Sequence, residues 1–248
     1  MMALNQFVNK IKTHGIVRTL LYSAFHVVRP YWRKFWLEPV RKSYSQSGED
    51  AIIDRILGNK KDGIYLDIGA YDPYEMSNTK RFYDRGWHGV NIEPEPGRYQ
   101  KIKQARPRDI NLNVGLARTN GVLTFYDVEP AALATFSAER AKEVERMGAK
   151  IKRTIEVKVI SLASVLEDQL KGAPVDFCTL DAEGMDLEIL KSNDWKRFRP
   201  RVICVEVSNE ARENEETTET FLTNLGYRKM TETYEYGNPL NAIYVDQR

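Results

Sequence analysis

The sequence of 248 residues contains only two cysteines and three histidines, and it has no long hydrophobic run. Two cysteines cannot form a disulfide framework. Cys178 and Cys204 each lie inside a mostly apolar run, so we expect buried free thiols and a reducing, cytoplasmic setting. The uncharged stretch Thr19–Val28 is about half as long as a membrane-spanning helix. It also has no cleavage site typical of a secretory signal.

Several catalytic motifs are absent as well. The sequence has no nucleophile-elbow serine, no HExxH motif, no Walker loop and no cysteine cluster. These absences weigh against hydrolase, kinase and zinc-site functions. The 42% of apolar residues and the net charge of +2 exclude a disordered chain. The length fits one folded domain with an appendage.

Residues 1–43 differ in charge from the rest of the chain. They carry eight basic residues against the single acid Glu38, a net charge of +7 that leaves −5 for residues 44–248. Seven aromatic residues are interleaved among them at loose helical spacing. This pattern predicts a helical arm that either packs on the domain or on a partner subunit, which allows an oligomer, or lies peripherally on an anionic membrane. Nucleic acid is not expected as a partner, because the remaining residues are acidic overall.

From Tyr44 on, apolar runs of strand length alternate with helical patterns, which predicts an α/β domain over residues 44–248. Strands separated by helices form βαβ units, so we expect a Rossmann-like, mostly parallel central sheet with helices on both faces. Ligands of such sheets bind beyond the carboxyl ends of the strands. The expected strands are Ile64–Ile68, Gly89–Ile92, Ile110–Val114, Val122–Tyr126, Ile155–Ile160, Val175–Leu180, Val202–Val207, Tyr227–Thr233 and Ala242–Val245. The expected helices are Glu75–Arg85, Gly97–Ala105, Ala138–Met147, Leu162–Leu170 and Thr217–Leu225.

The first two strand ends carry a nucleotide-binding pattern. Asp67 is followed by Gly69 and Ala70 at the first turn, where a glycine lets the backbone approach a ligand. Glu93 ends the second strand, at the spacing of an acid that binds ribose hydroxyls. Tyr71 stands where a dinucleotide fingerprint has a further glycine, which disfavours an NAD-dependent enzyme.

The fourth central strand end is acidic. Asp181, Glu183 and Asp186 follow the run Val175–Leu180, and Glu206 lies at the end of the next central strand. Because adjacent strands lie about 5 Å apart, we expect Asp181, Glu183 and Glu206 to converge. Three interpretations stay open: a divalent cation such as magnesium held by Asp181 and Glu206, a general base with hydrogen-bond acceptors, or acids that only favour a helix N-terminus.

These residues, with several others, resemble the FkbM-type methyltransferases, which have the class I S-adenosylmethionine-dependent fold. The resemblance runs from about Ser43 to the end of the chain. It rests on the ordered blocks Tyr44–Asp50, Leu66–Ala70, Ser77–Thr79, Gly86–Glu93, Ala134–Ser137 and Leu180–Gly184.

The resemblance implies methyl transfer from S-adenosylmethionine to an oxygen, commonly a sugar hydroxyl of a glycan, glycolipid or natural product. The implied cofactor-binding residues are Asp67, Gly69 and Ala70 at the methionine end, Glu93 at the ribose, Asn113 near the adenine, and Asn78 in support. Family members often carry His or Ala after the Glu183-Gly184 pair, whereas Met185 stands here. The role of catalytic base therefore moves to Asp181 or Glu183. The alternative is a catalytically silent module of this fold that is recruited to a partner enzyme or a membrane.

Overall fold

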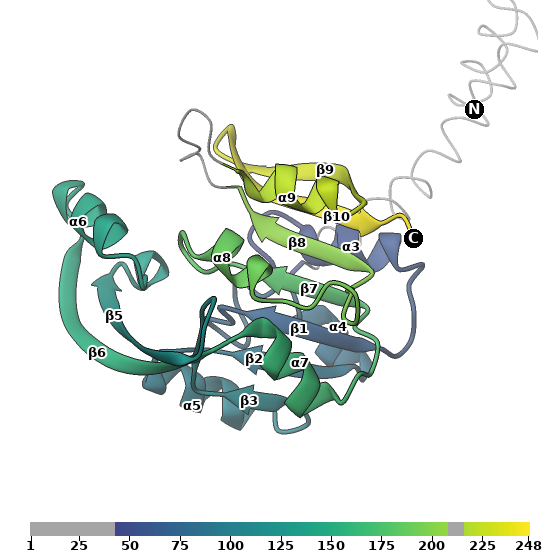
Figure 1. Ribbon diagram of the computed structural model, residues 1–248, viewed down its shortest axis with the longest axis horizontal. Coiled ribbons are helices and arrows are strands. Elements are labelled where there is room, and N and C mark those ends of the chain that lie inside the picture. Colours follow the sequence, from purple (N-terminus) through teal and green to yellow (C-terminus); the bar gives the residue numbers. More distant parts are fainter. Residues whose placement is uncertain (1–42, 208–215) are drawn as a thin grey trace, which may run out of the picture. The chain divides into compact units, whose positions relative to one another are not determined.

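A computed structural model of the chain describes residues 43–207 and 216–248 (Figure 1). The predicted arm over residues 1–43 lies outside this range apart from Ser43, so its role stays a prediction. The described residues belong to one folded unit, Ser43–Arg248. None of their helices combines the length and the hydrophobicity needed to cross a bilayer.

Seven strands form the central sheet. They are β1 (Ile64–Ile68), β2 (His88–Ile92), β3 (Ile110–Leu112), β7 (Phe177–Leu180), β8 (Val202–Glu206), β9 (Tyr227–Glu235) and β10 (Asn238–Asp246). Their order is β3-β2-β1-β7-β8-β10-β9, and the first five run parallel while β10 is antiparallel to both of its neighbours. The strand order reverses between β1 and β7, which is where open α/β sheets bind ligands. The predicted Rossmann-like class I methyltransferase fold is confirmed.

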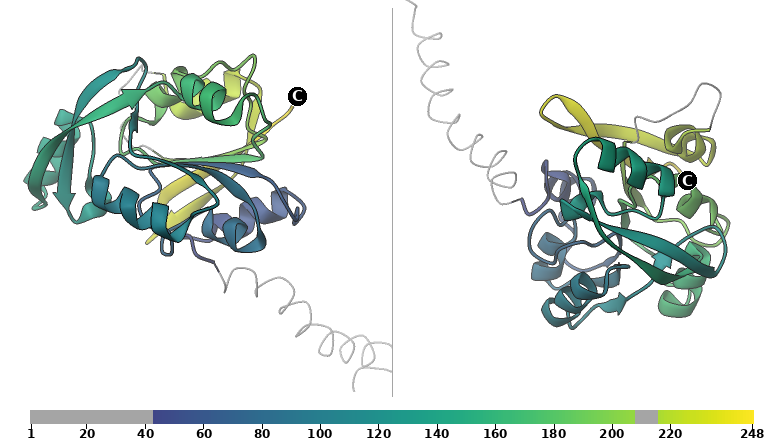
Figure 2. Two further views of the ribbon diagram at one scale, coloured as in Figure 1. Left: turned by 90° about the horizontal axis from the view of Figure 1, so that it is seen from below. Right: turned by 90° about the vertical axis from the view of Figure 1, so that its left-hand side faces the viewer.

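Helices cover both faces of the central sheet, as predicted (Figure 2). They are α3 (Glu49–Ile56), α4 (Lys80–Arg85), α5 (Pro96–Ala105), α7 (Leu162–Leu170), α8 (Asp186–Lys191) and α9 (Thr218–Asn224). Leu66 and Cys178 pack in a core with α7, α8 and α9, whereas their neighbours Tyr65 and Phe177 pack in a second core with α3 and α4. Successive strand residues point to opposite faces, so the mixed apolar pattern of these strands fills both cores. Both cysteines are buried free thiols, as predicted.

A separate three-stranded sheet lies beside the central one (Figure 1). This second sheet has the order β4-β6-β5, with β4 at Gly115–Leu116, β5 at Gly121–Glu129 and β6 at Lys150–Ile160. Between β5 and β6 the chain forms the 3₁₀-helix η1 (Ala131–Leu133) and the helix α6 (Ala138–Arg146). Phe125, Ala134 and Val157 form a small core of its own. The sequence predicts strands here but not that they leave the central sheet.

Some predicted boundaries are wrong for identifiable reasons. The helix expected over Glu75–Arg85 begins only at Lys80, because Arg106 donates hydrogen bonds to Pro73 O at 2.8 Å and to Ser77 Oγ at 3.1 Å and thereby holds the preceding loop. Neither α3 nor α8 is predicted, since six to eight residues carry little helical periodicity. In contrast, α7 has the predicted bounds.

The register of the parallel strands aligns their ends. Ile68 pairs with Ile92 on one side and with Leu180 on the other, and Leu180 pairs with Val205. The next residue along each strand therefore lies at the same edge of the sheet: Gly69, Glu93, Asp181 and Glu206.

One glycine of the central sheet is required by packing. A Cβ atom on Gly89 would lie 2.3 Å from both the ring and the carbonyl oxygen of Tyr65. We expect Gly89→Ala to lower the free energy of unfolding by about 1–3 kcal/mol, because this core has no room for an added methyl group. A Cβ on Gly121 meets nothing within 4 Å, so Gly121→Ala should be neutral or slightly stabilising. Urea unfolding of the two variants tests this; equal stabilities would contradict it.

Candidate active site

A cavity of about 340 Å³ lies at the carboxyl edge of the central sheet. Its walls are the turns after β1, β2 and β7, the end of β8, and residues of the second sheet and of η1. This volume is in the range of small-molecule sites. The sequence-predicted residues that line it are Asp67, Gly69, Ala70, Asn78, Glu93, Asp181, Glu183 and Glu206.

The turn after β1 packs closely on the end of β7. Gly69 has a positive φ of 78°, and a Cβ atom there would lie 1.9 Å from the carbonyl oxygen of Asp181. The N–H groups of Gly69 and Ala70 both donate to the carbonyl of Ile92, at 3.0 and 3.1 Å. Only glycine satisfies the conformation and the contact together, so the turn brings the ends of β1, β2 and β7 against one cavity.

Asp67 is a buried carboxylate at the back of this turn. Its Oδ2 accepts a hydrogen bond of 2.5 Å from Thr79 Oγ1. Burial raises the pKa of Asp67 to about 6, although the Thr79 hydrogen bond and the nearby charge of Arg106 oppose the rise. A buried carboxylate that is mostly ionised at neutral pH is suited to bind a ligand cation such as an ammonium group.

Glu93 is held by backbone N–H groups on both of its oxygens. Oε2 accepts from Tyr71 at 3.0 Å and Oε1 from Glu95 at 2.8 Å, while Arg98 Nη1 lies 3.8 Å away. Tyr71 adopts a positive φ of 48°, within the turn that brings its N–H to Glu93. Burial raises the pKa of Glu93 to about 7. Each oxygen keeps a second lone pair, so the fixed carboxylate can still accept from ligand hydroxyls.

The two predicted asparagines have different positions. Asn78 lines the cavity and donates from Nδ2 to Thr179 Oγ1 at 2.8 Å. Asn113 is not part of the cavity lining; its Nδ2 donates to the carbonyls of Glu93 and Pro94, both at 2.9 Å. Asn113 therefore acts on the cavity indirectly, by fixing the backbone that carries Glu93.

The predicted convergence of Asp181, Glu183 and Glu206 is confirmed. Carboxylate oxygens of these three residues, the acidic cluster, lie within 4.8 Å of one another. The neighbouring Asp186 has a different role: its carboxylate accepts from the N–H groups of Ala182 at 3.1 Å and Gly184 at 3.4 Å at the start of α8. The helix-end interpretation therefore accounts for Asp186, but it does not account for the acidic cluster.

The acidic cluster cannot be fully ionised at neutral pH. Burial, the larger cause, and repulsion from Asp181, the smaller one, together raise the pKa of Glu183 to about 8. The same two effects raise the pKa of Glu206. The positive charge of Arg140 on α6 opposes both shifts. The cavity walls also raise the pKa of Asp181, although its side chain is open to the solvent in the cavity. Because Asp181 is the best hydrated of the three, it is the first to ionise, while the other two share protons.

Two residues that sequence reasoning missed join the second sheet to the cavity. Arg98 donates from Nη2 to the carbonyl of Ala131 at 3.0 Å, and its guanidinium lies 5.3 Å from the centre of the Tyr71 ring. Thr135 donates from Oγ1 to the carbonyl of Glu183 at 2.8 Å. The block Ala134–Ser137 marks Thr135 in the sequence, but nothing distinguishes Arg98 from the many other arginines.

Four further cavity-lining residues come from three other segments of the chain, and we call the part of the cavity that they line its far end. Gln46 precedes α3, Met76 follows β1, and Glu235 and Leu240 belong to β9 and β10. The buried acid Glu49 joins two of these segments, because its Oε1 accepts from Thr233 of β9 at 2.6 Å and its Oε2 accepts from the backbone of Ser47 at 2.8 Å. The far end of the cavity is therefore held in place by hydrogen bonds and presents both polar and apolar side chains.

Comparison with known proteins gives a family match over most of the chain. The model of the methyltransferase FkbM domain matches residues 67–229. None of the curated proteins matches. Among solved structures, the chain is similar to an FkbM methyltransferase from Methylobacillus flagellatus, with 12% identity, a TM-score of 0.48, and coverage of 75% of this chain but only 44% of that one. It is also similar to a TehB-like SAM-dependent methyltransferase from Corynebacterium glutamicum, with 10% identity, a TM-score of 0.43, and coverage of 88% and 97%.

The raised pKa of Glu206 predicts how the stability of the folded protein depends on pH. Burial and repulsion raise the pKa of Glu206 from 4.5 to about 9, so the folded protein keeps a proton that an unfolded glutamate has already lost, and this residue destabilises the fold progressively as the pH rises between these two values. Glu206→Gln removes the penalty, and we expect it to raise the free energy of unfolding by on the order of 1–2 kcal/mol at pH 8, with little effect at pH 5. The exposed Glu145→Gln is the control. Thermal unfolding at both pH values tests this, and a gain at pH 5 equal to that at pH 8 would contradict it.

Proposed function

Because this chain belongs to the FkbM methyltransferase family, we propose that it transfers the methyl group of S-adenosylmethionine to a sugar hydroxyl of a glycan, glycolipid or glycosylated natural product. The observation that carries the proposal is the single cavity onto which Asp67, Glu93 and the acidic cluster all open. One end of this cavity offers groups for a nucleoside with a charged tail. The other offers a base and a mixed polar and apolar surface.

The residues present fit the cofactor. Asp67 provides a buried negative charge for the ammonium of the methionine end, and Glu93 provides fixed acceptor oxygens for the two ribose hydroxyls. Leu116, Phe125 and Phe136 add an apolar wall to the same cavity. When bound, S-adenosylmethionine supplies a methyl group that its sulfonium already activates.

The acidic cluster supplies the proton acceptor for the attacking hydroxyl. An alcohol loses its proton as its oxygen attacks, so a carboxylate must lie within hydrogen-bond reach of that oxygen. Asp181 directly follows β7, next to the strand that carries Asp67, and it is the first of the cluster to ionise. Protons held by Glu183 and Glu206 limit the repulsion around it. A magnesium ion held by Asp181 and Glu206 is the alternative use of the same oxygens.

The far end of the cavity supports a saccharide acceptor. Gln46 and Glu235 offer hydrogen-bond donors and acceptors for hydroxyl groups, while Met76 and Leu240 offer apolar surface for the C–H faces of a sugar ring. Tyr74, two residues before Met76, is 52% exposed. Such a combination suits a ring whose edge is polar and whose faces are not.

Removing the Glu93 carboxylate should weaken cofactor binding. We expect Glu93→Ala to cost about 1.5–3 kcal/mol of affinity for S-adenosylhomocysteine, because charge-assisted bonds to the ribose are lost. Isothermal titration calorimetry measures this as a dissociation constant at least about tenfold higher. Glu75→Ala, an exposed acid outside the cavity, is the control, and far-UV circular dichroism checks that both variants fold. Unchanged affinity of a folded Glu93→Ala protein would refute the assignment.

Asp181→Asn keeps the shape of the side chain and removes its charge. We expect S-adenosylhomocysteine affinity to be kept while turnover falls by a factor of about 10²–10⁴, the usual worth of a positioned base. Transfer of radiolabelled methyl to a panel of methyl glycosides and glycolipid extracts measures turnover, with the exposed Asp62→Asn as control.

Treatment with EDTA distinguishes a carboxylate base from a bound magnesium ion. If the carboxylates hold a cation, EDTA abolishes turnover and magnesium restores it; if Asp181 acts as a base, EDTA has no effect. Full turnover of Asp181→Asn would refute both versions.

A further inference from the structure

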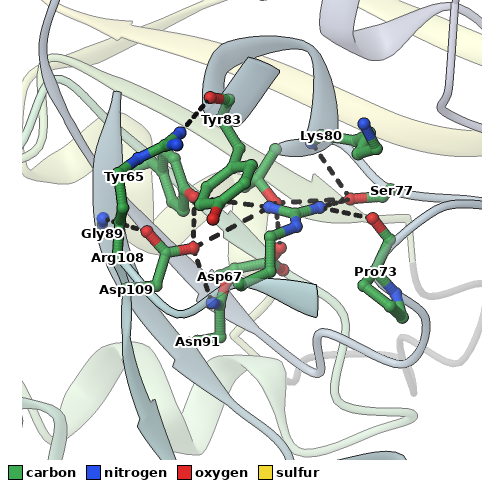
Figure 3. Close-up of polar contacts among 12 residues, drawn as sticks. Tyr65, Asp67, Pro73, Ser77, Lys80, Tyr83, Gly89, Asn91, Arg108 and Asp109 are labelled. Carbon is green, nitrogen blue, oxygen red and sulfur yellow. Dashed lines mark hydrogen bonds and ion pairs between the residues drawn. The ribbon is translucent and has the colours of Figure 1, made fainter. Parts of the chain in front are cut away.

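A buried arginine lies directly behind the cavity. Arg106 follows the last turn of α5 and is only 2% exposed. Its Nη1 donates to Thr79 Oγ1 at 3.2 Å and to Tyr65 Oη at 3.3 Å. Its Nη2 donates to Pro73 O at 2.8 Å and to Ser77 Oγ at 3.1 Å (Figure 3). One guanidinium therefore donates to three hydroxyl groups and to one carbonyl of the loop between β1 and α4.

The chemistry of the donors fixes the direction of these hydrogen bonds. A guanidinium only donates, so the oxygen of Thr79 accepts from Arg106 and its single proton is available to Asp67 Oδ2, at 2.5 Å. The same reasoning applies on the other side, where Tyr65 accepts from Arg106 and donates to Asp109 Oδ2 at 2.5 Å. Figure 3 shows Asp67 and Asp109 among the residues of this network. Arg106 thus sets the orientation of the hydroxyl that binds Asp67.

The side chain of Thr79 binds Asp67 instead of capping the helix that it precedes. Thr79 is the N-cap residue of α4, yet its side chain caps no N–H of that helix. Ser137, Ser161 and Thr217, the N-caps of α6, α7 and α9, each accept from the backbone N–H three residues on. For α4, the N–H of Lys80 is bound by Ser77 Oγ at 3.2 Å instead. A fully buried threonine that faces Asp67 rather than its own helix indicates a role in the cavity.

We infer that Arg106 and Thr79 are positioning residues for the cofactor: Arg106 orients the Thr79 hydroxyl, and the Thr79 hydroxyl holds the Asp67 carboxylate against the ammonium group of the methionine end. The inference rests on the proposed function. Holding Oδ2 fixes the rotation of the carboxylate about its Cβ–Cγ bond. Arg106 also fixes the loop that ends at Asn78, another residue of the cavity lining. Both contacts act on the side of the cavity where the amino-acid part of the cofactor binds.

Two ligands distinguish this role from a purely structural one. S-adenosylhomocysteine carries the amino-acid part, whereas 5′-methylthioadenosine lacks it. We expect Thr79→Val to raise the dissociation constant of S-adenosylhomocysteine by about tenfold or more and that of methylthioadenosine by less than about twofold, as measured by calorimetry. Thr79→Ser keeps the hydroxyl and should retain wild-type affinity for both. Tyr227→Phe is the control, because it removes another buried hydroxyl, whose hydrogen bond of 2.7 Å to the carbonyl of Pro200 lies outside the cavity.

Each outcome decides the question. Selective loss of S-adenosylhomocysteine affinity in Thr79→Val, restored in Thr79→Ser, supports the inference. Equal weakening of both ligands, or no weakening, overturns it, since the bond would then be structural only. Arg106→Lys keeps the positive charge but loses the paired Nη1 and Nη2 donors of the guanidinium, so it should show the same selective loss of S-adenosylhomocysteine affinity. If this variant does not fold, the two Thr79 variants decide alone. A wild-type protein that binds neither ligand overturns the proposed function itself.

Discussion

The register of the parallel strands is the constraint on which the site depends. Backbone hydrogen bonds between β2, β1, β7 and β8 align their last residues, so the side chains that follow leave the sheet in one row. Acids that are far apart in the chain, such as Glu93 and Glu206, therefore open onto the same cavity. A slip of one residue in any of these strands would turn its acid to the other face of the sheet and dismantle the site.

This alignment concentrates negative charge where water is scarce. Asp67 and Glu93 are buried, and the acidic cluster places three carboxylates within 4.8 Å of one another. The positive charges of three arginines reduce the free-energy cost of keeping these carboxylates ionised. Arg106 acts on Asp67, Arg98 on Glu93, and Arg140 on Glu183 of the acidic cluster. Arg98 and Arg140 come from helices, and Arg106 directly follows the end of α5. The strands thus supply the acids, and the helices supply the cations that allow the acids to stay there.

The sequence predicts the strand-borne part of this arrangement well. Apolar runs locate the central strands, and the acids after them follow from the general rule that ligands bind at strand ends. The helical and tertiary contributions are less accessible. The late start of α4 depends on the hydrogen bonds from Arg106 to the loop that precedes this helix. The second sheet depends on pairing between segments about 30 residues apart along the chain. Thr79 lies inside the predicted helix Glu75–Arg85, and no sequence pattern predicts that its hydroxyl faces Asp67. Local patterns carry no information about such partners.

The second sheet has a consequence for how such an enzyme can diverge. It is one continuous insertion between β3 and α7 with a small core of its own, and its polar contacts with the rest of the site include Thr135 with Glu183 and Arg98 with Ala131. Residues can be exchanged or added within it without disturbing the strand register that fixes the acids. The wall facing the ligand is therefore free to drift in sequence and length while the chemical groups stay constant. Changes in this one module alter the apolar wall that Leu116, Phe125 and Phe136 give to the cavity, while the strand ends keep their acids in place.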